Sequence, residues 1–169
     1  MDAYLQRALQ AMEKAIEEMT ATELARHRPG KWSAADIVEH ISLAYNGTSK
    51  LLQWYLDTGK LSTDKPTERQ QMMTKFVLEG ENFPSGLQAP GFAMPQGINP
   101  ESVLPYLRDA VARLDAAVLR CKQAFGEEVI LGKHAALGPL TGKQWCQFHW
   151  VHTSHHVKQI EELRRWTSK

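Results

Sequence analysis

The chain is 169 residues long, with 43% hydrophobic and 23% charged residues, and one globular domain over residues 1–169 suits this length and composition. The apolar content is too high and the net charge too low for a disordered protein. A formal net charge of +1 also argues against a nucleic-acid-binding surface, which requires an excess of Lys and Arg.

The first predicted helix covers residues 2–19. Apolar side chains recur there at the spacing of one helix face: Leu5, Leu9, Met12, Ile16 and Met19. A polar connection through residues 26–30 follows.

The second predicted helix begins at Ser33, a suitable N-cap, and carries Asp36 in its first turn. It ends near Gly59, because Gly is common just beyond a helix C-terminus. Its buried side is predicted to consist of Ile37, Ile41, Ala44, Leu51, Leu52 and Tyr55.

A shorter helix is predicted over residues 67–79, with Met72, Met73 and Phe76 on its buried side. Between residues 80 and 100 the chain carries four prolines and four glycines, which break helices and weaken strands. This long loop is compatible with a lid over a pocket or with a well-packed surface crossover, and the crossover is the simpler interpretation. Four apolar side chains indicate that it packs against the protein: Phe83, Leu87, Phe92 and Met94.

The next helix is predicted to begin with Ser102 as N-cap and to end by about Gly126. Pro105 then falls in the first turn, where its missing N–H costs little. The predicted buried stripe consists of Leu107, Val111, Leu114, Val118 and Leu119.

A second loop covers residues 127–140 and includes a short extended piece at residues 129–131. The last helix then runs from Thr141 to about Trp166, and Gln144 completes a capping box with Thr141. These elements predict an all-α fold: a four-helix bundle of up-down type with a crossover, plus a short extra helix and long loops.

The compartment is predicted from the cysteines and the N-terminus. Cys121 and Cys146 both fall in helical segments, so no disulfide framework is expected. The chain lacks the basic and apolar segments of a signal peptide at its start, and no apolar run reaches about 18 residues, the length of a membrane helix. We therefore expect a cytoplasmic protein with no membrane partner.

Four of the seven histidines crowd residues 149–156 of the last predicted helix: His149, His152, His155 and His156. An α-helix advances about 100° per residue, so all four share about one third of its circumference. His152 and His156 are one turn apart, and both imidazoles can face one ion. Such a His-x-x-x-His pair is a typical half-site for zinc and similar metals.

A catalytic metal site needs about three protein ligands, and the third has to come from another helix. His40 lies beside Ile37, Ile41 and Ala44 on the predicted buried side of the second helix. A neutral imidazole is tolerated in a core when both nitrogens have partners, and a metal ion is one such partner. The alternative is that these histidines are hydrogen-bonded core residues that bind no metal.

The roles of several other residues stay open. His149 is a second-sphere residue or a fourth ligand, and His155 bonds across the bundle or lies at the rim of the site. Cys146 is a thiolate ligand or, more simply, a buried inert cysteine. We expect His134, in the loop before the last helix, at the surface rather than at a pocket mouth.

Other polar and aromatic residues are given structural roles. Glu39 diverges by about 100° from His40 on the helix, so we do not expect it to act as a base in the same site. Gln159 is expected to bond a buried group. Four tryptophans are expected in the core or at helix junctions: Trp32, Trp54, Trp145 and Trp150.

Two segments resemble the DinB-like (YfiT-like) superfamily of metalloenzymes. Residues 30–41, Gly-Lys-Trp-Ser-Ala-Ala-Asp-Ile-Val-Glu-His-Ile, resemble the Trp-Ser, apolar-acidic, then His pattern at the start of the family's second helix. Residues 152–160, His-Thr-Ser-His-His-Val-Lys-Gln-Ile, resemble its His-x-x-His-His-x-Gly-Gln-Ile signature, with Lys158 in place of the frequent Gly. Residues 138–145 are similar to one branch of the family.

This resemblance implies that His40, His152 and His156 are metal ligands in a four-helix bundle that is commonly a homodimer. Lys158 should lie off the metal-facing side, so its presence leaves this ligand set in place. Members of the superfamily include thiol-dependent S-transferases and isomerases, in which the metal activates a low-molecular-weight thiol. The family name comes from a DNA-damage-inducible gene and does not imply DNA binding.

Three hypotheses on function follow. A divalent ion, most simply zinc or nickel, on three neutral imidazoles keeps an open position that activates a thiol or water. This gives an S-transferase-like or hydrolase-like enzyme with a small-molecule substrate, and the lack of an obvious general base favours thiol activation. The alternative is a non-enzymatic metal-binding bundle with a stress-related or sensing role, and the third hypothesis is a bundle without metal. The sequence assigns no catalytic residue.

Overall fold

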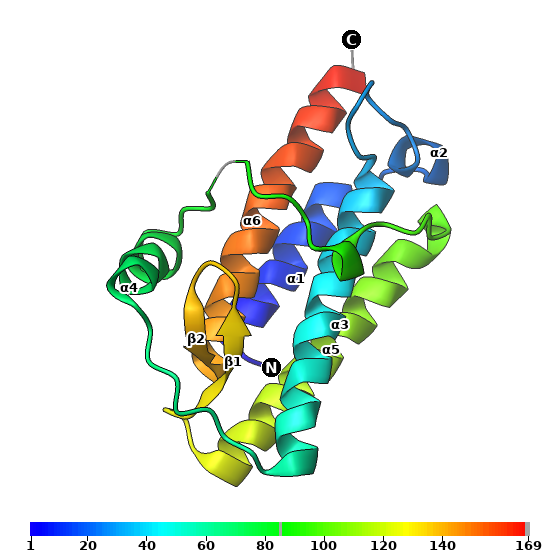
Figure 1. Cartoon of the computed structure of the whole chain (residues 1–169). Coiled ribbons are helices and arrows are strands. Elements are labelled where there is room, and N and C mark those ends of the chain that lie inside the picture. The colour runs from blue at the N-terminus through cyan, green and yellow to red at the C-terminus, as the bar shows by residue number, and fades with distance from the viewer. Residues whose placement is uncertain (85, 168–169) are drawn as a thin grey trace.

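A computed structural model describes residues 1–84 and 86–167 of the chain (Figure 1). The protein is mostly helical, as predicted. The longest helices within these residues are α1 (Ala3–Ile16), α3 (Ala34–Thr58), α5 (Val103–Phe125) and α6 (Gly142–Thr167). None of the described helices is long and apolar enough to cross a membrane.

The long helices pack mainly as two pairs. α3 lies along α5 and α1 lies along α6, while α6 also contacts α3. Fully buried side chains from all four helices form the core between them, among them Met12, Ile41, Leu114 and Ile160. The contact of α3 with α6 matters most for function, because it joins the two helices on which the sequence predicts metal ligands.

The starts of these two helices are fixed by their own sequence, as predicted. The Ser33 backbone N–H donates to Asp36 Oδ2 at 2.9 Å, and the Asp36 N–H donates back to Ser33 Oγ at 3.1 Å. Thr141 and Gln144 make the same reciprocal pair at the start of α6. At the other end of α3, Gly59 has a φ of 63°, a left-handed conformation that Gly adopts at no steric cost.

A small antiparallel sheet is the feature that the predicted all-α class omits. Strands β1 (Ile130–His134) and β2 (Gly138–Thr141) pair with Lys133 opposite Pro139, and the register shifts between Ile130 and Lys133. The predicted extended piece at residues 129–131 covers only the start of this hairpin. Trp145 Nε1 donates to the Leu131 carbonyl at 2.8 Å and so holds the hairpin against α6.

The N-terminal region is shorter in helix than predicted. α1 ends at Ile16 rather than near residue 19, and a one-turn helix, α2 (Ala21–Leu24), follows it. Thr20 and Glu23 form a capping box at the start of α2. The capping box is visible in the sequence, so this turn could have been predicted.

Of the three residues predicted on the buried side of the shorter helix at residues 67–79, Met73 is partly buried against the core and the other two are exposed. The helix consists of α4 (Glu68–Thr74) and a π-helical turn, η1 (Lys75–Glu79). Met72 and Phe76 are 73% and 51% exposed, whereas Val77 and Leu78 are buried. A π-turn is wider than an α-turn, so it changes which side chains face the core. Leu119 and Trp54 are also exposed rather than buried, because each lies on the outer side of its helix.

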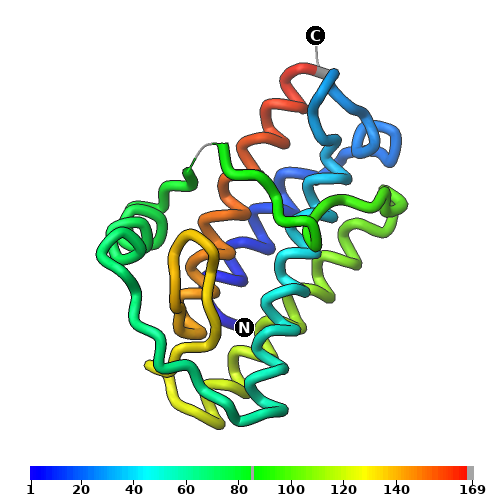
Figure 2. The backbone as a smooth tube through the Cα atoms, viewed as in Figure 1, coloured from blue at the N-terminus to red at the C-terminus, as the bar shows by residue number. Residues whose placement is uncertain are grey.

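The segment between residues 80 and 100 crosses from the side of α4 over to α3 before it reaches α5 (Figure 2). It contains two short 3₁₀ turns, η2 (Gly91–Ala93) and η3 (Pro100–Ser102). The apolar side chains of this segment pack less than predicted: Leu87 and Met94 are exposed, Phe83 is half-buried, and Phe92 is exposed although its ring lies against Gly47 of α3. Backbone atoms rather than side chains make most of its polar contacts with α3.

Candidate metal centre

Three histidines from two helices converge on one point. His40 comes from α3, and His152 and His156 come from adjacent turns of α6. His152 Nε2 lies 3.2 Å from His40 Nε2 and 3.1 Å from His156 Nε2. One nitrogen from each ring lies within 4.8 Å of the others, and all three residues are buried. The structure therefore brings together the three residues that the sequence singled out.

The spacing of His152 Nε2 from the other two nitrogens fits shared binding of a divalent cation. Ligands of tetrahedral zinc, with Zn–N bonds of about 2.0–2.1 Å, lie about 3.3 Å from one another. The two distances from His152 are close to this value. Three imidazole nitrogens that face each other inside a protein need a shared proton or a cation to balance their lone pairs. The donor set is one that zinc, nickel and copper accept.

In two of the rings, the nitrogen that faces away from the cluster makes a hydrogen bond that fixes the orientation of the ring. His40 Nδ1 lies 2.7 Å from the Ala93 carbonyl, and His156 Nδ1 lies 2.8 Å from Gln159 Oε1. Both oxygens only accept, so each Nδ1 carries the proton and each Nε2 presents a lone pair to the cluster. Such outer contacts are what orient metal-binding histidines.

The third ring is held by packing. His152 lies between Phe83 and Phe148, with ring centroids at 5.0 and 5.5 Å and interplanar angles of 22° and 18°. Its Nδ1 is buried and has no hydrogen-bond partner within the described residues. The aromatic rings on both sides therefore set the direction of this imidazole, and its Nε2 lies between those of the other two.

The protonation state of the cluster suits metal binding. Burial lowers the pKa of all three histidines: that of His40 falls below its ordinary value, that of His156 falls to about 3 and that of His152 falls well below its ordinary value. The neighbouring imidazoles lower the pKa of His152 and His156 further, because positive charges would repel. The three rings are therefore neutral at pH 7, with lone pairs free to bind a cation.

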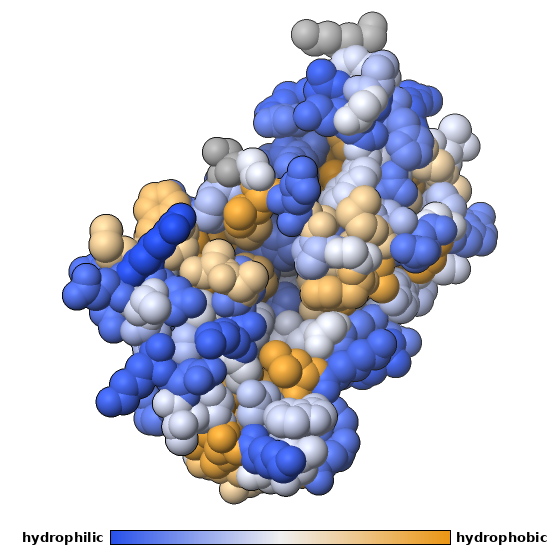
Figure 3. Space-filling model, viewed as in Figure 1, coloured by the Kyte–Doolittle hydropathy of each residue, from blue (hydrophilic) through white to orange (hydrophobic). Residues whose placement is uncertain are grey.

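The cluster lies in the wall of a cavity of about 800 Å³. Its walls come from the loop before α3, from α3, from Phe83, residues 87–90, Phe92 and Ala93, from the tip of the β1–β2 hairpin and from α6. Figure 3 shows a hollow on this face, bordered by hydrophobic and hydrophilic side chains. The 80–100 segment lines this cavity and is also tied to α3, so it has features of both a lid and a packed crossover. A volume of this size holds a small molecule.

Glu39 is a structural partner of the site that the sequence interpretation missed. It is buried beside His40, and its Oε2 accepts the Gly97 N–H at 3.0 Å and the Ile98 N–H at 3.1 Å. Glu39 and His40 thus hold the same loop, one through its N–H groups and the other through the Ala93 carbonyl. The available signal was a carboxylate inside a run of buried α3 residues, which requires partners from another segment.

The other histidines of α6 lie outside the three-membered cluster. His149 is buried, with Nε2 2.9 Å from Thr48 Oγ1 and its ring stacked on Tyr45. His155 is half-buried and accepts a hydrogen bond from Gln159 Nε2 at 3.1 Å. Gln159 thus bonds both His155 and His156, in line with the buried-group role expected for it.

Cys146 and His134, the two further candidates from the sequence, lie outside the histidine cluster. Cys146 is fully buried, and burial raises the pKa of its thiol far above the ordinary value, so it does not supply a thiolate at neutral pH. The prediction of a surface position for His134 is wrong. His134 lines the cavity, burial lowers its pKa to about 4, and its Nδ1 accepts the N–H groups of Ala136 and Leu137.

Comparison with known families gives one match. A family model described as the DinB superfamily matches residues 4–160, which is most of the chain and includes all three histidines of the cluster. Searches of curated proteins and of solved structures give no significant match.

Proposed function

The chain belongs to the DinB superfamily, and on that premise we propose that His40, His152 and His156 bind one divalent metal ion in a metal-dependent enzyme. The proposed metal is zinc or nickel, and the proposed reaction is transfer of a low-molecular-weight thiol, with hydrolysis as the second possibility. In this proposal the long helices form a four-helix bundle, and the protein is a cytoplasmic homodimer.

The observation that carries the proposal is the convergence of three neutral Nε2 atoms beside a cavity. Ala93 and Gln159 fix two of the rings from behind, and aromatic rings fix the third. A cluster whose only role was to fill the core would not need three imidazole nitrogens pointed at one another. The adjacent cavity gives a small molecule access to the same point.

The chemistry that a divalent ion supplies on such a donor set is to lower the pKa of a bound thiol or water. The protein's own residues hold the donors and enclose the reacting groups in a partly apolar cavity. Glu39 is engaged by Gly97 and Ile98, and Glu162 is the single carboxylate that lines the described cavity. The shortage of carboxylates favours thiol transfer, because hydrolysis relies more on a general base.

A second candidate function is a metal-binding bundle without catalytic activity, with a stress-related or sensing role. It is favoured by the position of the cluster, which joins α3 to α6 and would tie the two helices together. The two candidates differ in whether a small molecule reaches the metal, and the cavity beside the cluster favours the enzyme.

Metal analysis of protein purified without a histidine tag tests the proposed site. We expect about one equivalent of zinc or nickel per chain, none in His40→Ala, and the parental amount in His27→Ala, where an exposed histidine outside the cluster is removed. The proposal is wrong if neither the parent nor the variants take up metal at any concentration of metal supplied.

A second assay separates the enzyme from the passive binder. Glutathione, bacillithiol and mycothiol are each incubated with an electrophile, and thiol consumption is compared for metal-loaded, metal-stripped and His40→Ala protein. Metal-dependent consumption that is lost in the variant supports the transferase. Tight metal binding with no consumption of any thiol favours the passive bundle.

A further inference from the structure

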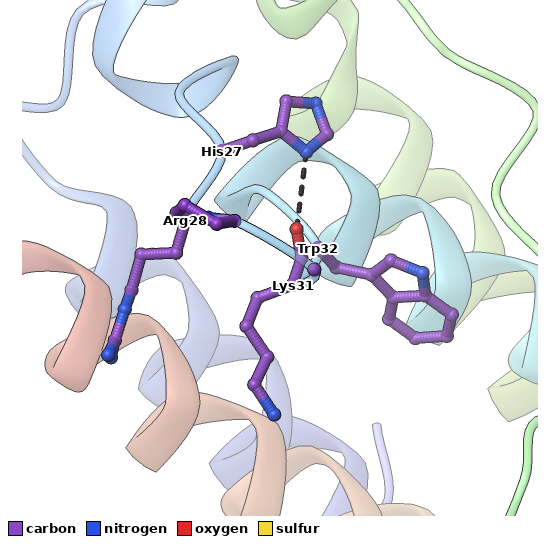
Figure 4. A pocket seen from close by; sticks show the side chains of 6 residues that line it. His27, Arg28, Lys31 and Trp32 are labelled. Carbon is purple, nitrogen blue, oxygen red and sulfur yellow. Dashed lines mark hydrogen bonds between the residues drawn. The ribbon is translucent and has the colours of Figure 1, made fainter.

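Two cations stand at the mouth of the cavity, in the loop that precedes α3. Arg28 and Lys31 line the cavity together with Trp32, and Arg28 is half-buried with its guanidinium 5.8 Å from the Trp166 ring. Figure 4 shows both cationic side chains extending from the loop toward α6, while Trp32 points the other way. We call Arg28 and Lys31 the basic rim.

The basic rim is not neutralised by the protein. Neither cation makes an ion pair shorter than 4.0 Å with any described residue, whereas the third cation of the lining, Lys133, lies 3.3 Å from Asp64. Glu162 is the one acidic residue among the described lining residues. The cavity therefore carries a net positive charge, which concentrates anions at its mouth.

The basic rim is joined to the histidine cluster through one short stretch of chain. The ring of Trp32 lies 4.9 Å from that of His40, and Lys31 is the preceding residue. Residues 28–32 thus form a wall that runs from the charged mouth to the cluster. At the cluster end the cavity is lined by aromatic rings, including Phe83 and Phe148, which both stack on His152.

We propose that this cavity takes a small amphipathic organic anion. Its acid group binds the basic rim, its apolar body lies against Trp32, and its other end reaches the histidine cluster beside Phe83. The role of this anion as a substrate rests on the proposed function, whereas its binding needs no metal. Guanidinium and ammonium groups make charge-assisted hydrogen bonds to carboxylates, sulfonates and phosphates alike.

A pair of fluorescent probes tests the proposal. 8-Anilinonaphthalene-1-sulfonate carries a sulfonate on an aromatic body, and N-phenyl-1-naphthylamine has the same body without the charge. The variant Arg28→Gln, Lys31→Gln should weaken binding of the sulfonate probe about tenfold and leave the neutral probe within about twofold. The matched control is Lys50→Gln, Arg113→Gln, which removes one Lys and one Arg from exposed positions outside the cavity and should change neither affinity.

Two further measurements keep the result interpretable. Ala44→Trp fills the cavity and should abolish binding of both probes; binding that survives it lies elsewhere and overturns the proposal. Equal weakening of both probes in the rim variant, or no weakening of the sulfonate probe, also overturns it. All titrations are run with metal-stripped and zinc-loaded protein, so that loss of charge selectivity is distinguished from failure of the metal site.

Discussion

The two helices that supply the histidine cluster hold their ligands in different ways. On α6, His152 and His156 are one turn apart, and the partner of His156 is Gln159 on the same helix. On α3, the partner of His40 is the carbonyl of Ala93, 53 residues away in the chain. The α6 half is thus organised by local helix geometry, and the α3 half depends on how a distant loop is placed.

The loop that serves His40 has its own attachments to α3. Glu39 accepts hydrogen bonds from Gly97 and Ile98, and the Phe92 ring packs on Gly47, where an added Cβ would come within 2.7 Å of the ring. The orientation of the His40 ring therefore depends on the loop, whereas His152 and His156 keep their spacing as long as α6 is intact. The cluster thus consists of a rigid half on α6 and a loop-dependent half on α3.

The largest effect is expected from removing a ligand of either half. His156→Ala and His40→Ala should both lose metal binding, since two imidazoles are too few for a site of this type. The parent should gain about 2.7 kcal/mol in free energy of unfolding when free zinc is 100 times its dissociation constant. Urea unfolding with and without zinc measures this gain. A variant that keeps the full zinc-dependent gain would show that its residue is not a ligand.

The next effect comes from the partner of His156 on the rigid half. Gln159→Leu removes the acceptor of the His156 Nδ1–H and frees the ring to turn, so zinc affinity should fall about 10- to 100-fold. Gln159→Glu keeps an acceptor at that position and is the matched control, with affinity near that of the parent or higher. Competition titration with a chelator of known affinity measures both. Equal losses in the two variants would mean that Gln159 acts through packing alone.

Acid should destabilise the α6 half more than the α3 half, because α6 carries more buried imidazoles than α3. Burial, and then repulsion from His134, lowers the pKa of His149 to about 3 in the folded protein, against about 6.5 when unfolded. Below pH 6.5 the unfolded state therefore binds the extra proton, and the free energy of unfolding falls by about 1.4 kcal/mol per pH unit for this residue.

His149→Gln removes that titration, and its amide can still bond Thr48. In metal-free protein, the decline of the unfolding free energy between about pH 6 and pH 4 should be shallower by about 1.4 kcal/mol per pH unit than in the parent. Urea unfolding at several pH values measures the slope. The difference at pH 8, where both states are neutral, gives the packing cost separately. Parallel slopes would contradict the assigned role of His149.

The sequence predicts the α6 half of the cluster better than the α3 half for a physical reason. Helix periodicity places His152 and His156 together without knowledge of the rest of the fold, and it places His40 on a buried face. The partner of His40 is a backbone carbonyl in a loop, and carbonyl groups carry no signature in the sequence. Contacts of this kind depend on the path of the loop, which Pro and Gly content does not determine.

The same limit explains the errors in the fold. The four long helices follow from strong periodicity and from two capping boxes, at Ser33 and Thr141. Where the helix changes its geometry, at η1, periodicity assigns the wrong face, and Phe76 is exposed. The β1–β2 hairpin and the half-buried position of His134 in the cavity wall depend on pairing between strands, which helix periodicity does not detect.

The smallest expected effect tests whether the loop-dependent half really depends on its loop. Glu39→Gln leaves one acceptor oxygen but removes the negative charge that binds Gly97 and Ile98, so the loop should detach more often and present the Ala93 carbonyl to His40 less of the time. Zinc affinity should fall about threefold to tenfold, less than in Gln159→Leu, because His40 itself stays on the helix. Limited proteolysis distinguishes this local effect from a general loss of stability. Cleavage within residues 80–100 should rise while cleavage elsewhere stays at the parental rate. Saturating zinc should restore the protection of residues 80–100. Proteolysis that rises evenly along the chain would mean that Glu39 stabilises the fold as a whole, and that the two halves of the cluster do not differ in the way proposed.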